Sequence, residues 1–74
     1  MHTNQAVAAE VRAAIARAGL RQADLADAIG ISRGSLSSRL SGERAFRIDE
    51  LVAIARVLGV QPSVLLPQGL AVAA

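Results

Sequence analysis

The sequence predicts an all-α fold in which five helices form one compact domain. Three observations indicate this class. Of the 74 residues 53% are hydrophobic with a single aromatic, apolar residues recur at helical spacing, and glycine or proline separates the apolar runs. A chain of this length allows one domain. We expect it to span residues 1–67, followed by a short apolar C-terminal tail at 68–74.

The first two predicted helices lie at about residues 3–18 and 22–29, closed by Gly19 and Gly30. Arg12 falls off the apolar face of the first helix, so we expect it in solvent. The predicted inward-facing residues are Val7, Val11, Ala14, Ile15 and Ala18 in the first helix and Leu25, Ala26 and Ile29 in the second. A tight glycine-containing turn then leads to the next helix, which is typical of a helix-turn-helix.

The next predicted helix, residues 32–41, has an unusual surface. Ser32 can cap its N-terminus and Gly42 can close its C-terminus. Only Leu36 and Leu40 are large and apolar, and their spacing puts them on one face. The rest is serine, glycine and arginine, a surface that suits close approach to a polar partner such as nucleic acid.

After this helix, a loop carries Phe46, which we interpret as a hydrophobic anchor, with stacking on a ligand as the alternative. A helix follows at about residues 48–58. A last short helix is expected within 60–66, because Pro62 is tolerated at a first helical position and Pro67 prevents extension. The apolar tail is expected either to fray or to form a small dimer contact.

The positive charge is concentrated in one part of the chain. Residues 30–48 contain four arginines and one glutamate, a net charge of +3, whereas the rest of the chain has a net charge of −1. This asymmetry is the distribution expected for phosphate binding, although a solvated basic surface would look the same.

Composition argues against several other classes. The chain has no cysteine and one histidine, so we expect no disulfide, no metal site and no cofactor. No cluster of titratable residues suggests a catalytic site, so we expect no enzymatic activity. It lacks a run of roughly 18 apolar residues that would span a membrane and has no recognisable secretory signal. We therefore expect a cytoplasmic protein.

Several runs in the expected order resemble the Cro and phage-repressor type of helix-turn-helix regulators. The matching runs are Leu20-Arg21-Gln22-Ala23-Asp24-Leu25-Ala26, Gly30-Ile31-Ser32, Leu36-Ser37, Leu40-Ser41-Gly42, Arg44, Leu51-Val52-Ala53-Ile54-Ala55-Arg56-Val57-Leu58-Gly59-Val60 and Leu65-Leu66. The resemblance covers about residues 11–66 and implies a lambda-repressor-like DNA-binding domain. It also implies double-stranded DNA as the partner.

The resemblance also implies roles for individual residues. Positions of the recognition helix would read bases, and flanking positions would contact phosphates. The implied base-reading residues are Arg33, Gly34, Ser37 and Ser38; the implied phosphate-contacting residues are Arg21, Gln22, Ser32, Arg44 and Arg47. Arg33 is expected to carry most of the sequence information, because arginine bonds guanine in a bidentate manner. A phosphate contact alone is the alternative for Arg33.

Two residues depart from the family pattern. Arg21 stands where Ser or Thr often caps the second helix, so that cap is expected to be weak. Arg39 stands where many members have an apolar residue at the edge of the core. Three interpretations are open for Arg39: a stem that covers Leu36 and Leu40 with the head in water, a head that pairs with an acidic neighbour, or a head that reaches phosphate.

The sequence thus favours a DNA-binding transcriptional regulator that acts as a homodimer, most simply a repressor, in a bacterium or phage-infected host. The recognition helix, residues 32–41, would enter the major groove. The alternative is an antitoxin-like or adaptor module that uses the same fold to bind a protein partner. The apolar tail is the feature that favours this alternative.

Overall fold

The computed structural model describes residues 3–67, which form four α-helices and one 3₁₀ turn. The elements are α1 (Thr3–Ala18), α2 (Gln22–Ile29), α3 (Arg33–Leu40), α4 (Ile48–Leu58) and η1 (Pro62–Leu65). The all-α fold is confirmed. The tail at 68–74, with its predicted fraying or dimer contact, lies outside the described residues.

The prediction of a fifth α-helix within residues 60–66 is wrong, because only Pro62–Leu65 are helical and they form the 3₁₀ turn η1. Pro62 fixes the first position of the turn. Leu66 already has extended backbone (φ −101°, ψ 140°), because a residue before proline is disfavoured in the helical region. The two prolines therefore leave room for a single tight turn.

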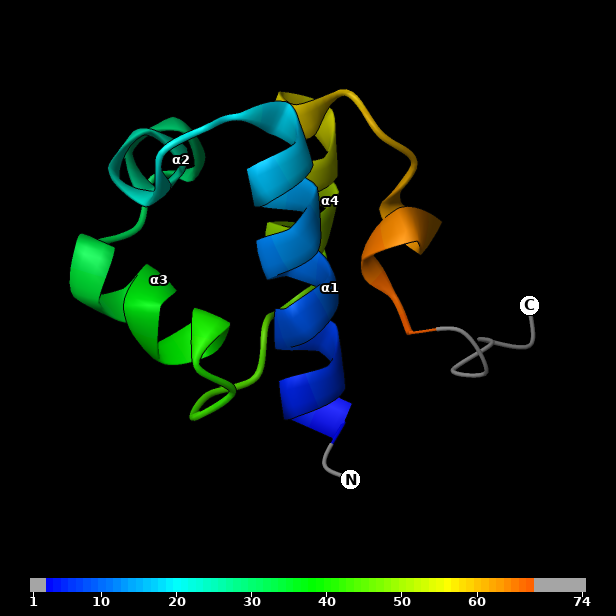
Figure 1. Cartoon of the computed structure of the whole chain (residues 1–74). Helices are drawn as coiled ribbons and strands as arrows, with labels where there is room; N and C mark the ends of the chain where they lie inside the picture. The colour runs from blue at the N-terminus through cyan, green and yellow to red at the C-terminus, as the bar shows by residue number, and fades with distance from the viewer. Residues whose placement is uncertain (1–2, 68–74) are drawn as a thin grey trace.

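The helices are arranged around α1 and α4, which lie side by side in the middle of the molecule (Figure 1). The pair α2 and α3 lies on one side of them, and η1 lies on the other. α1 packs against α3, α4 and η1, while α2 packs against α3 and α4. α1 and α2 thus form the support against which α3 packs.

The core is small and aliphatic. Its most deeply buried large side chains are Leu25, Leu36, Ile54, Leu65 and Val11. Each element from α1 to η1 contributes at least one of them, so no element can be removed without opening the core. Burying each such side chain contributes about 1.5–3 kcal/mol.

Two details of the predicted packing change. Ala18, expected to face inward, is exposed at the end of α1, whereas Ala8 is fully buried. Phe46 is half-buried and packs against the core, as expected for an anchor.

Within residues 3–67, no helix is both long and apolar enough to cross a bilayer.

Candidate nucleic-acid interface

The turn between α2 and α3 is short and firmly bonded. The amide of Gly30 donates to the carbonyl of Ala26 at 2.9 Å, and the amide of Ile31 donates to the same carbonyl at 3.1 Å. Gly30 has a left-handed backbone (φ 77°), which glycine adopts without a Cβ penalty. Ile31 packs against the core. These contacts hold α2 and α3 in the helix-turn-helix arrangement that the sequence predicts.

α3 begins with the serine cap that the sequence predicts. The Ser32 hydroxyl accepts a hydrogen bond from the amide of Ser35 at 3.0 Å and lies 2.9 Å from the Ser35 hydroxyl. By contrast, Arg21 provides no side-chain cap for α2, as its residue type indicated. Its guanidinium instead pairs with Asp24 at 3.1 Å.

The N-terminal part of α3 presents three of the four predicted base-reading residues to solvent. Arg33, Gly34 and Ser37 are exposed, whereas Ser38 is half-buried. A Cβ added at Gly34 would meet nothing within 4 Å. The internal packing of the domain therefore gives no reason for a glycine rather than a larger residue at this position.

The predicted phosphate-contacting residues lie on both sides of α3 in the chain. All five (Arg21, Gln22, Ser32, Arg44 and Arg47) are exposed. Arg47 lies 3.2 Å from Asp49, but both side chains are 72% exposed. Exposed pairs of this kind contribute little, so the arginine remains available to a phosphate.

The loop after α3 folds back onto the helix end. The carbonyl of Ser38 accepts the amides of Glu43 at 3.1 Å and Arg44 at 3.3 Å. Gly42 has φ +84°, and a Cβ there would lie 2.7 Å from Cγ of Gln5 in α1. The backbone of Arg44 is thus attached to the same residue, Ser38, that the sequence places among the base readers.

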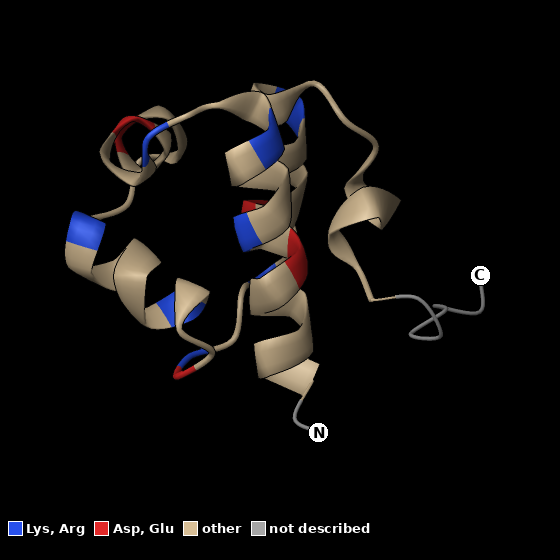
Figure 2. Ribbon diagram, in the orientation of Figure 1, with Lys and Arg blue, Asp and Glu red and all other residues tan. Residues whose placement is uncertain are grey.

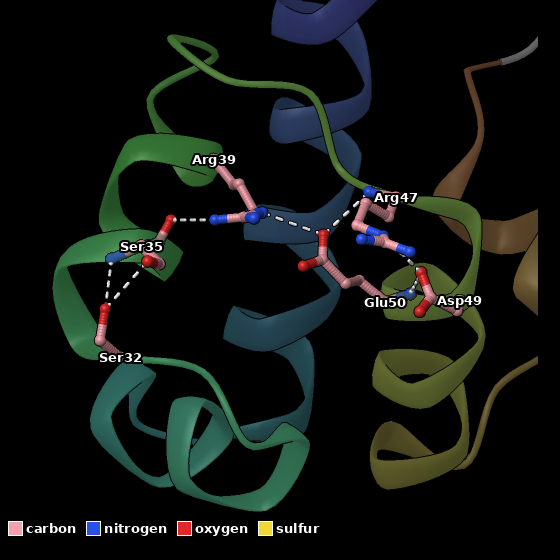
Figure 3. A network of polar contacts seen from close by, with 6 residues as sticks. All are labelled: Ser32, Ser35, Arg39, Arg47, Asp49 and Glu50. Carbon is pink, nitrogen blue, oxygen red and sulfur yellow. Dashed lines mark hydrogen bonds and ion pairs between the residues drawn. The ribbon is translucent and has the colours of Figure 1, made fainter.

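The role of Arg39 was open in the sequence, and the structure shows an ion pair with Glu50 of α4 (Figure 3). Arg39 Nε lies 2.9 Å from Glu50 Oε1, and Arg39 Nη1 donates to the carbonyl of Ser35 at 3.0 Å. The side chains are only 14% and 10% exposed. The same Oε1 also accepts the backbone amide of Arg47 at 2.8 Å.

Sequence reasoning did not single out Glu50. Two signals could have found it: an arginine at an apolar position needs a partner, and Glu50 occupies the third position of α4, where a carboxylate can bond the N-cap amide. Arg12 is exposed, as the sequence predicts, and its guanidinium also donates to the carbonyl of Leu40 at the end of α3, a contact that the sequence did not indicate.

Basic residues therefore stand at both ends of α3 and in the loop that follows it (Figure 2). Arg33 at the start is exposed, while Arg39 in the last turn is turned inward by its ion pair. A polar, small-surfaced helix flanked by exposed arginines can approach a phosphate-lined groove closely.

A family model described as helix-turn-helix matches residues 11–65. The chain belongs to this family, of the Cro/C1 type. The domain is accordingly a DNA-binding transcriptional regulator. No curated protein matches the sequence.

Among solved structures, the domain is similar to the clp gene regulator ClgR from C. glutamicum. The two share 25% sequence identity with a TM-score of 0.82. The match covers 88% of this chain and 84% of the ClgR chain. The similarity extends over nearly the whole chain, so the arrangement of α1, α4 and η1 around the helix-turn-helix is shared as well.

Proposed function

We propose that this domain reads a specific DNA sequence by placing the first turn of α3 in the major groove. The observation that carries the proposal is the exposed pair Arg33 and Gly34, with open space at Gly34. Arg33 would bond guanine O6 and N7, a contact worth about 1–3 kcal/mol of discrimination. Gly34 would let the backbone come close, and Ser37 and Ser38 would contact bases directly or through water.

The proposed phosphate contacts would lie on both sides of the first turn of α3. Arg21 and Gln22 at the start of α2 would contact one strand, and Arg44 and Arg47 in the loop would contact the backbone beyond α3. Ser32 can join them without losing its cap, because its hydroxyl hydrogen can turn from Ser35 to a phosphate oxygen while the oxygen still accepts the Ser35 amide.

One domain covers a half-site, so we expect a homodimer whose two α3 helices lie about 34 Å apart on one face of the duplex. Occupation of the groove excludes other proteins from the same site, which favours repression. This role would place the protein with the nucleoid, in the cytoplasm of a bacterium or of a phage-infected host.

Selection of binding sites from random duplex DNA tests the proposal. We expect a palindromic motif with a guanine in each half-site, and an asymmetric motif would contradict the two-fold dimer. Arg33→Ala should then remove the preference for that motif over random DNA, while Arg44→Ala should weaken binding to both. Equal weakening of both by Arg33→Ala would show that Arg33 contacts only phosphate.

A further inference from the structure

Two hydrogen bonds meet at one carboxylate oxygen behind the proposed DNA-binding surface, and a third links one of the donors to α3. Glu50 Oε1 accepts Arg39 Nε from α3 and the Arg47 amide from the end of the loop, and Arg39 also bonds the Ser35 carbonyl (Figure 3). Arg39 stands just before the loop and Arg47 stands at its end. A single oxygen atom of Glu50 in α4 therefore bonds residues at both ends of the segment 39–47, which carries Arg44.

From this geometry we infer that Glu50 is a positioning residue that fixes the phosphate-contacting loop relative to the base-reading turn of α3. The inference rests on the proposed function for its consequence in DNA binding. Glu50 and Arg39 are too buried to contact DNA themselves, at 10% and 14% exposure of their side chains. They act through Arg44 and Arg33, which are exposed.

The burial of the pair argues for positioning rather than for stability. Withdrawing two charges from water costs about as much as their attraction returns, and apolar replacements of similar size are often neutral or stabilising. An apolar pair could cover the core equally well, but it could not accept the Arg47 amide or hold the Ser35 carbonyl. The charged pair therefore contributes the fixed position of the loop relative to α3.

The double variant Arg39→Leu with Glu50→Leu separates the two roles. It leaves the net charge unchanged and leaves no buried charge without a partner, so thermal stability is expected to stay near that of the wild type. The matched control, Glu10→Ala with Arg17→Ala, also removes one cation and one anion, both of them from α1. The full-length chain is used throughout.

The first measurement needs no DNA. Backbone ¹⁵N relaxation is expected to give order parameters above about 0.8 at Arg44 and Arg47 in the wild type and in the control. In the double variant they should fall towards about 0.6, because the loop has lost one of its attachments. Unchanged order parameters would overturn the inference whatever the domain binds.

The second measurement is the ratio of affinities for the selected duplex and for a scrambled duplex. The double variant should lower this ratio by about tenfold, whereas the control should change it by less than about twofold. A loosened loop with an unchanged ratio would overturn the positioning role. A wild-type ratio near one would instead contradict the proposed function, and the relaxation measurement would still decide the inference.

If the double variant does not fold, two single variants replace it. Arg39→Lys keeps a cation opposite Glu50 but loses the fork that also reaches the Ser35 carbonyl, so its affinity ratio should fall by less than that of Glu50→Gln. Glu50→Gln removes the charge and is expected to lower the ratio by about fivefold or more. Asp27→Asn also removes one negative charge, from an exposed position of α2, and is the control for the change in net charge. Equal effects of Glu50→Gln and Asp27→Asn would overturn the inference.

Discussion

Gly34 lies within α3 on a side of the helix that no other residue covers. A glycine at this position therefore lowers the stability of the domain without any gain in internal packing. Glycine destabilises a helix by about 0.5–1 kcal/mol relative to alanine, and a Cβ at this position would meet nothing within 4 Å. The domain therefore gives up some stability at the position that is proposed to lie closest to DNA.

Gly34→Ala should accordingly move stability and binding in opposite directions. The free energy of unfolding is expected to rise by about 0.5–1 kcal/mol in urea titrations. The affinity for the selected duplex should fall on the order of tenfold, because the new methyl group occupies the approach surface. A variant that is less stable than the wild type would show that the glycine serves folding instead.

Gly42 is a glycine of the opposite kind, because both its backbone and its surroundings demand it. Its φ of +84° disfavours a Cβ, and that Cβ would lie 2.7 Å from Gln5 Cγ and 3.1 Å from Gln5 Cα. The loop thus passes very close to the first turns of α1.

Gly42→Ala is expected to lower the free energy of unfolding by about 2–3 kcal/mol, part from the backbone and part from the contact with α1. Gly19→Ala is the matched control: its φ is +68°, but its Cβ would meet nothing within 4 Å. It should cost only about 1–2 kcal/mol. Equal costs in urea denaturation would mean that the loop moves away from α1 without loss.

At the scale of elements, α2 and α3 differ in how they begin. Ser32 caps α3 through the Ser35 amide at 3.0 Å, while Arg21 leaves α2 without a side-chain cap. Both helices have only eight residues. In helices this short, one capping hydrogen bond makes a large contribution to the stability of the first turn.

Ser32→Ala should therefore destabilise the domain by about 1 kcal/mol, and Arg21→Ser should stabilise it by about 0.5–1 kcal/mol. Loss of the exposed Arg21–Asp24 pair subtracts little from that gain. Thermal or urea unfolding measures both changes. Ser37→Ala, an exposed change inside α3, is the control and should be neutral or slightly stabilising. A Ser32→Ala domain as stable as Ser37→Ala would contradict the role of the cap.

The helices themselves could be predicted closely, because their ends are local. Gly19, Gly30 and Gly59 close three of them, and the α-helix bounds follow from those signals and the apolar spacing. Pro62 and Pro67 did not reveal that the last segment would be a 3₁₀ turn, since both an α-helix and a 3₁₀ turn tolerate an initial proline.

The contacts of the site could be predicted less well, because they join distant parts of the chain. Arg12 reaches the Leu40 carbonyl and Arg39 reaches Glu50 only once α1, α3 and α4 are packed. The exposed positions of α3 followed from Leu36 and Leu40 alone, whereas the partners of Arg12 and Arg39 depend on how the helices cross.

At the scale of the whole molecule, binding should be strongly dependent on salt. If each subunit of the proposed dimer neutralises about three phosphates, the slope of log affinity against log salt concentration is expected to be about −5. Fluorescence anisotropy between about 50 and 200 mM salt measures the slope. Arg44→Ala in both subunits should make it shallower by about 2. A slope near zero would contradict the phosphate contacts.

The shared carboxylate oxygen of Glu50 has a consequence for natural variation. A chain in which an apolar residue replaces one member of the Arg39–Glu50 pair keeps a largely buried charge without a hydrogen-bond partner, which costs about 3–5 kcal/mol. A small domain with a total stability of about 5–15 kcal/mol tolerates such a step poorly. Related sequences should therefore carry both charges or neither, and positions 39 and 50 should vary together even though they lie on different helices.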